Sequence, residues 1–201
     1  MGTRIATSVE PEMTVSAILD IATLRLPSGR LVVADPLTEG RGAGRVLSER
    51  IPPGEYRVQA AVVAFESEYE DVRTAVKEEV AVRLLLAEEP AASWEPALAE
   101  GDDVRLLREN ETCGFDTDGA AGAFADASGW EGLADRYRRY LMEQEDDAGE
   151  TVSDGYVRTT DQATGGDLVS FCTDSFCTDG DGTHPVSVVV VVGRLPDLRL
   201  L

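Results

Sequence analysis

A chain of 201 residues is long enough for one compact domain with a hydrophobic core, and 43% apolar with 28% charged residues is typical of a soluble globular protein. Thirty-eight Asp and Glu residues against eighteen Lys and Arg residues give a formal net charge of -20 at pH 7. Nucleic acids and anionic membrane surfaces are bound through a cationic face, so this charge excludes both as expected partners. It is compatible with a cationic protein partner.

The sequence carries the marks of a cytoplasmic protein. Its N-terminus has no apolar core of signal-peptide length and carries Glu10 and Glu12. The longest apolar run, Val186 to Val192, is interrupted by Ser187 and is too short to span a bilayer. We expect a flexible segment over residues 1–16 and a single domain over residues 17–201. The few cysteines, odd in number, favour reduced thiols over a secreted disulfide framework, although a turn would let the last two pair: Cys113, Cys172 and Cys177.

The first predicted element is a β-hairpin over Ala17 to Val33, because Pro27, Ser28 and Gly29 have turn chemistry between two apolar stretches. The glycine-rich run from Gly40 to Arg45 lacks the Lys-Ser/Thr of a phosphate-binding P-loop, so a solvated connector is favoured.

Two further strands are predicted at Tyr56–Phe65 and Val80–Leu86 from their apolar and β-branched content. The stretch between them, Glu66 to Glu79, is rich in charge. A solvated hairpin end or a short helix explains that stretch without any ligand.

One helix is predicted over Gly129 to Gln144. Ser128 and Glu131 match a capping box, in which both side chains satisfy backbone N–H groups at the start of the helix. An apolar stripe with helical spacing follows, and we interpret it as facing the core rather than as an aromatic binding site. Its members are Trp130, Leu133, Ala134, Tyr137 and Leu141.

The rest of the chain is strand-rich. The acidic segment Glu143 to Gly155 is predicted to be a loop. Strands are predicted at Tyr156–Arg158, Leu168–Cys172, Val186–Val192 and Leu198–Leu201. The fold class is therefore α+β, a β-rich single domain with antiparallel strands and one or two helices.

Two Asp-x-Asp-Gly units make up the most unusual motif, at Asp116–Gly119 and Asp179–Gly182. Carboxylates two residues apart before a glycine let a tight loop present several oxygens to a hard divalent cation. The candidate metal ligands are Asp116, Asp118, Asp179 and Asp181. Neither unit has the third ligand or the closing glutamate of an EF-hand. Asp-Gly pairs are also ordinary turn residues, and the turn interpretation is favoured.

His184 is the only histidine and follows the second unit. Beside carboxylates it would serve as a general base or a metal ligand, whereas a loop histidine before a strand is the favoured alternative. A hydrolase-like site would gather Asp118, Asp126, Asp179, Asp181 and His184. It requires that two segments about sixty residues apart meet in space.

Cysteine chemistry provides two weaker alternatives. Cys113, Cys172 and Cys177 with His184 would form a three-cysteine, one-histidine zinc site, but their spacing matches known zinc patterns poorly. Cys177 and His184 would form a nucleophile pair only if the fold aligned them.

Several short motifs occur in an order that resembles a known bacterial family. They are Leu26–Arg30 with Ala34–Pro36, Pro52–Val58, Trp94–Ala97, Asp118–Asp126 and Gly180–Pro185. In this order they resemble the domain-of-unknown-function family DUF4241, from about Ile21 onward. His184 stands where the family pattern usually has tyrosine, and Cys177 and Thr178 stand where serine and glycine are common. The resemblance implies no established activity.

Two functions from different classes remain. The favoured one is a non-catalytic binding protein for a cationic protein partner, such as an immunity-type inhibitor of a basic toxin. The alternative is a hydrolase-like enzyme that depends on a divalent cation held by the aspartate units.

Overall fold

The computed structural model describes residues 4–5, 13–38, 44–69, 72–88, 93–107, 114–117, 120–173, 184–187, 189–192 and 199–200. Across these residues the chain forms antiparallel strands and one α-helix, α1 (Trp130–Met142), with a single 3-10 turn at Val104–Leu106. The predicted β-rich α+β fold is confirmed.

The strands form two large sheets and two small ones. The four-stranded sheet has the order β1 (Arg4–Ile5), β2 (Met13–Leu26), β5 (Gly54–Tyr69), β6 (Val72–Leu85). The six-stranded sheet has the order β10 (Glu150–Ser153), β11 (Tyr156–Thr160), β12 (Asp167–Cys172), β9 (Ala121–Asp126), β3 (Arg30–Ala34), β4 (Arg45–Arg50). The small sheets pair β13 (His184–Ser187) with β8 (Gly114–Thr117), and β15 (Arg199–Leu200) with β14 (Val189–Val192) and β7 (Ser93–Pro96).

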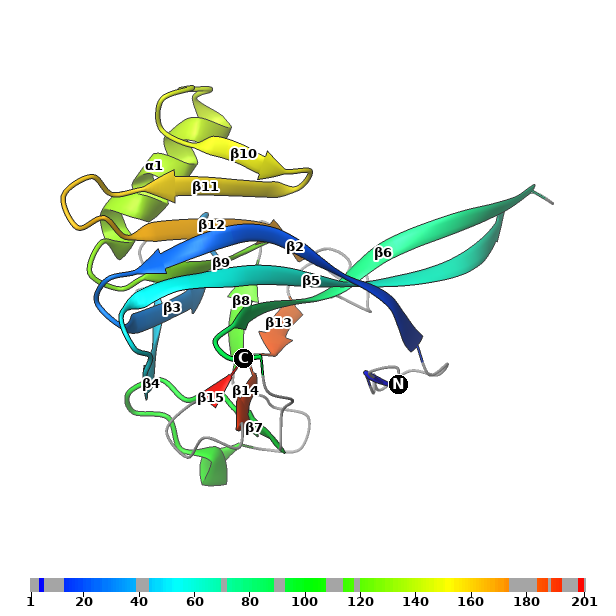
Figure 1. Ribbon diagram of the computed structural model, residues 1–201, viewed down its shortest axis with the longest axis horizontal. Coiled ribbons are helices and arrows are strands. Elements are labelled where there is room, and N and C mark those ends of the chain that lie inside the picture. Colours follow the sequence, from blue (N-terminus) through cyan, green and yellow to red (C-terminus); the bar gives the residue numbers. More distant parts are fainter. Residues whose placement is uncertain are drawn as a thin grey trace.

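The two large sheets pack face to face, and α1 covers the other face of the six-stranded sheet (Figure 1). The inner strands β3, β9 and β12 of the six-stranded sheet are buried on both faces, so alternate residues enter different cores. Leu31 and Val33 of β3 enter the core between the sheets, whereas Val32 enters the core beneath α1. The core between the sheets also holds Leu24, Leu26, Val58, Ala60, Leu84, Phe124, Tyr156, Val169 and Phe171.

The turn at Pro27–Gly29 exists, but the predicted hairpin pairing is wrong. The N–H of Gly29 donates to the carbonyl of Leu26 over 3.2 Å, and Gly29 has φ of 64°, which favours glycine. The strands on either side belong to different sheets, because β2 pairs with β5 while β3 pairs with β9 and β4. The apolar residues of β2 and β3 thus face each other across the core instead of sharing one sheet face.

Helix α1 begins one residue later than predicted, and the capping box is wrong. The N-cap residue is Gly129, which has no side-chain cap. The Ser128 hydroxyl donates instead to the buried carboxylate of Asp126. Leaving a buried carboxylate without a hydrogen-bond donor costs more free energy than leaving the helix N-terminus without a side-chain cap. The seam of Trp130, Leu133, Ala134 and Tyr137 packs on the sheet as predicted. Leu141 is exposed.

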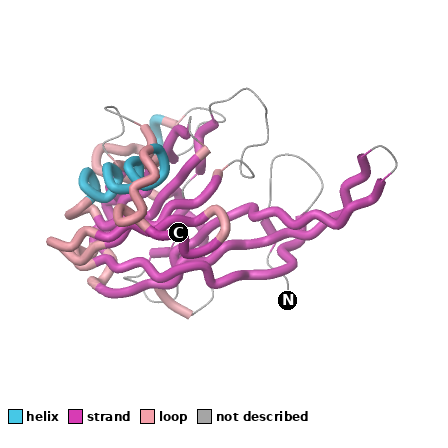
Figure 2. Tube along the Cα trace, turned by 90° about the horizontal axis from the view of Figure 1, so that it is seen from above, coloured by secondary structure: helices cyan, strands magenta, loops and turns pink. Residues whose placement is uncertain are grey.

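Strands β5 and β6 are longer than predicted and form a projecting hairpin. Of the two predictions for Glu66 to Glu79, the hairpin end is confirmed, since cross-strand pairing continues out to Tyr69 and Val72. We call residues 64–78 the arm; the structure describes all of it except residues 70–71. The arm extends beyond the two packed sheets (Figures 1 and 2).

The last part of the chain differs from its predicted elements in detail. The run Val186–Val192 contributes to two strands, β13 and β14, which pair with different partners. Strand β15 lies within the predicted Leu198–Leu201. Strand β10 forms inside the segment that was predicted to be an acidic loop, and it pairs with β11.

Candidate functional site

The first aspartate unit meets the strand that begins at His184, through the pairing of β8 with β13. Across this antiparallel pair His184 lies opposite Thr117, and Pro185 lies opposite Asp116. The backbones that bear the candidate metal ligand Asp116 and the candidate base His184 are therefore neighbours. The other candidates of these units, Asp118, Asp179 and Asp181, lie outside the described residues, as do Cys113 and Cys177.

Asp126, the remaining hydrolase candidate, lies elsewhere and is engaged in structural hydrogen bonds. It ends β9, five residues from Ala121, which places it roughly 16 Å along the strand from the end that follows β8. Its fully buried carboxylate accepts from the backbone N–H groups of Ser28 and Ser128, both over 2.8 Å, and from the Ser128 hydroxyl. It thereby ties the Pro27–Gly29 turn to the start of α1.

A second buried carboxylate joins the two sheets. Both oxygens of Asp167 on β12 accept from the Arg25 guanidinium on β2, over 2.8 and 2.9 Å. The Arg25 N–H and the Thr160 hydroxyl also donate to it, over 3.1 and 2.7 Å. With four donors on one carboxylate, this residue is a structural tie.

Among the described residues, no three His, Cys, Asp or Glu side chains gather closely enough to hold a metal ion. Cys172, the one cysteine whose side chain is described, is a free, exposed thiol. Within the same residues, no helix has the length and apolar character needed to cross a membrane.

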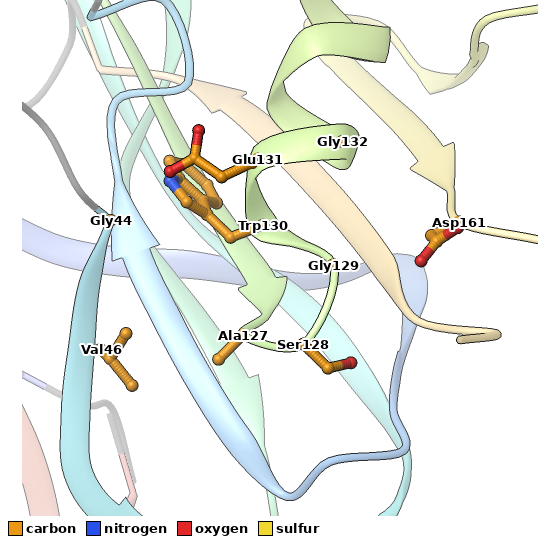
Figure 3. Close-up of a pocket in the computed structure, with 9 residues that line it drawn as sticks. All are labelled: Gly44, Val46, Ala127, Ser128, Gly129, Trp130, Glu131, Gly132 and Asp161. Carbon is orange, nitrogen blue, oxygen red and sulfur yellow. The ribbon is translucent and has the colours of Figure 1, made fainter. Parts of the chain in front are cut away.

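A pocket of about 450 Å³ opens at the start of α1 (Figure 3). It is lined by Gly44 and Val46, by residues 127–132 and by Asp161. A helix N-terminus attracts anions, but two carboxylates, Glu131 and Asp161, already line this one. The Asp161 pKa is lowered by hydrogen bonds from the Thr164 hydroxyl and the Ala163 N–H. The pocket therefore carries negative charge where an anionic ligand would bind.

The four-stranded sheet shows how acidic residues near the body are neutralised. The Gln59 amide donates to Asp20 over 2.5 Å and lowers the pKa of that carboxyl, and Arg57 lies 3.2 Å away from it. Arg83 in turn donates to Gln59 over 2.9 Å. Asp20, Arg57, Gln59 and Arg83 thus form a hydrogen-bonded network on this sheet.

A buried tyrosine forms a hydrogen bond at the base of the arm. The hydroxyl of Tyr156 on β11 donates to the carboxylate of Glu79 on β6. Burial of the phenol, reinforced by the Glu79 carboxylate, raises the pKa of Tyr156. This bond joins the six-stranded sheet to the point where the arm begins.

Beyond this point the arm exposes charged and apolar side chains on both strands. Phe65 and Glu66 of β5 are exposed, as are Lys77 and Glu78 of β6, and Phe65 lies opposite the half-buried Val76. Within the described residues, no hydrogen-bond or ion-pair partner contacts the carboxylates of Glu66 and Glu78. They therefore differ from Asp20, Asp126 and Asp167, whose charges are all compensated.

Among the described residues, the arm also has backbone edges with no pairing partner. Strand β2 pairs with β5 only up to Val15 opposite Val63, so from Ala64 to Tyr69 the only described neighbour of β5 is β6. The sequence analysis missed this feature, because it ended the strand at Phe65. The available signal was the β-branched residues Val72, Thr74 and Val76, which are spaced two apart as on one face of a strand.

Comparison with known proteins identifies the family. The model of the family described as a protein of unknown function, DUF4241, matches residues 24–190, nearly the whole chain, and the chain belongs to this family. No curated protein and no solved structure matches it.

Proposed function

We propose that this member of the DUF4241 family is a non-catalytic binding protein for a cationic protein partner, and that the arm is its contact surface. The observation that carries the proposal is the contrast in charge compensation. The carboxylates of Asp20, Asp126 and Asp167 in the body are hydrogen-bonded or paired, while Glu66 and Glu78 of the projecting arm are exposed, with no partner among the described residues.

Long-range charge supports the same proposal. A net charge of -20 attracts a cationic partner from a distance and accelerates encounter, to an extent that falls with ionic strength. The arm is also acidic in sequence, with Glu66, Glu68, Glu70, Asp71 and Glu78 against Arg73 and Lys77. An exposed free thiol at Cys172 accords with the reducing cytoplasm as its location.

The test compares two double variants that change the net charge equally. Glu66→Lys/Glu78→Lys reverses charge on the arm, and Glu143→Lys/Asp146→Lys reverses two exposed charges after α1. Each protein is immobilised and exposed to an extract of its own cells at about 50 mM and about 300 mM salt, which bracket strong and weak screening.

We expect a partner with a basic segment to bind the unmodified chain and the α1 variant at low salt, and to be lost from the arm variant. The proposal fails if no partner shows salt-dependent retention. It fails equally if both double variants lose the partner to the same extent, because the arm would then have no special role.

A second candidate is the divalent-metal-dependent hydrolase, which the β8–β13 pairing favours because it brings the Asp116 and His184 strands together. A bound cation stabilises the folded state by mass action. Thermal melts in EDTA and with added calcium, magnesium, manganese or zinc test it. A saturable rise in the melting temperature with one ion, absent from the Asp181→Asn variant, supports the metal site. An unchanged melting temperature with every ion rejects it.

A further inference from the structure

We infer that the partner binds as an extra β-strand along the free edge of β5 from Ala64 to Tyr69, in the place that β2 leaves open, and that the added segment is extended and cationic. This inference rests on the proposed function and names its binding mode. Six residues of strand offer an edge of about 20 Å. An edge of unpaired N–H and C=O groups is a template on which another chain forms main-chain hydrogen bonds.

Geometry makes this edge accessible. Strand β2 pairs with β5 as far as Val15 and Val63, then continues at Met13 and Thr14 as the partner of β1 instead. Figure 1 shows β2 bending away from the arm as β5 and β6 continue past it. A strand added here extends the four-stranded sheet outward in line with β2.

The other edge of the arm is protected against strand addition. Strand β6 is the edge strand of its sheet, and natural edges are guarded by lysine, other charges and bulges. Lys77, the only lysine of the sequence, is exposed on β6. A register shift leaves Val80 without an opposite residue, between Ala81 opposite Ala61 and Glu79 opposite Val62. From Ala64 to Tyr69 the β5 edge has no lysine and no register shift, and its charged residues are glutamates, which a cationic strand would pair with.

The side chains along this edge determine which kind of strand would bind there. Successive residues of a strand point to opposite faces, so Phe65 presents an apolar side chain on one face and Glu66 a carboxylate on the other. An added strand that alternates basic and apolar residues satisfies both. A second copy of this acidic arm would place like charges side by side, which is unfavourable.

The arm itself gains from a third strand. A two-stranded ribbon is marginally stable in water, whereas three strands with an apolar face are stable. Phe65 and Val76 already form a cross-strand apolar pair. An added strand would cover the exposed side of that pair and order the arm on binding.

The experiment uses the full chain and synthetic octapeptides of alternating lysine and valine. Two matched peptides carry backbone N-methyl groups, one on every lysine and one on every valine. Both keep the charge and the side chains, but each removes the N–H groups from a different edge of the peptide strand. Binding is measured by titration calorimetry, and amide hydrogen exchange is followed residue by residue by NMR.

We expect the parent peptide and one N-methylated isomer to bind alike, and the other isomer to bind about tenfold more weakly or worse, because it loses several main-chain hydrogen bonds. Amides within residues 64–69 become protected on binding. Glu66→Lys weakens binding more than Glu78→Lys, which changes the net charge equally.

Each alternative outcome is distinct. Equal binding by both N-methylated isomers, or protection of β6 in place of residues 64–69, overturns strand addition at this edge and leaves the proposed function standing. Protection of residues 64–69 that rises with protein concentration without peptide shows self-association and overturns the cationic occupant. Failure of all three peptides to bind overturns the inference, while the proposed function is still decided by the extract experiment.

Discussion

At their body end, strands β5 and β6 bury Val58, Ala60 and Leu84 between the two sheets, whereas at their outer end the same strands expose Phe65, Glu66 and Glu78. Burial beside a second sheet explains the first arrangement. The exposed outer end has no second sheet to pack against, since the arm extends past the six-stranded sheet (Figure 1). The outer ends of these strands thus lie outside the core between the sheets, and this is where the proposals place binding.

The largest expected effect contrasts two residues on the same strand. Leu84→Ala removes a fully buried side chain from the core and costs about 3 kcal/mol of unfolding free energy, whereas Val76→Ala in the arm changes it by less than about 0.5 kcal/mol. Chemical denaturation of both variants checks this. Equal losses would show that the arm packs against the body, and would remove the contrast on which the proposed function depends.

The next effect concerns the buried carboxylates of the body. Asp126→Asn replaces one acceptor oxygen by a donor, facing either the Ser28 or the Ser128 N–H, and we expect a loss of about 2 kcal/mol. Denaturation measures it. The matched control is Glu66→Gln on the arm, which leaves stability unchanged. A fully stable Asp126→Asn protein would contradict the structural role and return Asp126 to the list of candidate catalytic residues.

Two glycine-to-alanine substitutions test packing in the body, and we expect them to change the stability in opposite directions. A Cβ at Gly122 would lie 2.5 Å from a Phe171 ring carbon and 2.9 Å from one of Phe115, so Gly122→Ala costs about 1–3 kcal/mol. A Cβ at Gly132 meets nothing within 4 Å, and Gly132→Ala stabilises α1 by about 0.5–1 kcal/mol. Thermal melts should shift in opposite directions. Shifts in the same direction would mean that close approach at Gly122 is not what limits the core.

The sequence predicted the parts of this fold that depend on local pattern. Helical spacing from Trp130 to Tyr137 identified α1 to within two residues at either end, and apolar runs identified β5, β11 and β12. Pairing is not local. The same turn residues, Pro27–Gly29, can join two strands of one sheet or two strands of different sheets. Only packing across the core decides whether the flanking strands pair with each other.

The candidate site was predictable to a smaller extent. The first aspartate unit and His184 were singled out from the sequence, and their strands β8 and β13 pair, whereas the second unit, Asp179–Gly182, lies outside the described residues. Asp126 shares their composition but accepts structural hydrogen bonds, which depend on Ser28 nearly a hundred residues away. A single sequence shows which carboxylates exist, while their partners, and hence which of them are uncompensated, follow from tertiary structure.

The smallest expected effect lies at the boundary between body and arm, where the Tyr156 hydroxyl bonds to Glu79. Burial and the Glu79 carboxylate raise the pKa of Tyr156, so the folded state keeps this proton at alkaline pH while the unfolded chain releases it near pH 10. The unfolded state then binds fewer protons, and stability falls as the pH rises above about 10.

Tyr156→Phe removes this contribution to the slope of stability against pH. Tyr137 and Tyr56, whose pKa values burial also raises, keep their own contributions. At neutral pH the variant loses about 1 kcal/mol with the hydrogen bond. Unfolding free energies at about pH 8 and about pH 11 measure both effects. A variant with an unchanged slope would show that the Tyr156 phenol is not held protonated at the base of the arm, and that the boundary between body and arm is not fixed by this bond.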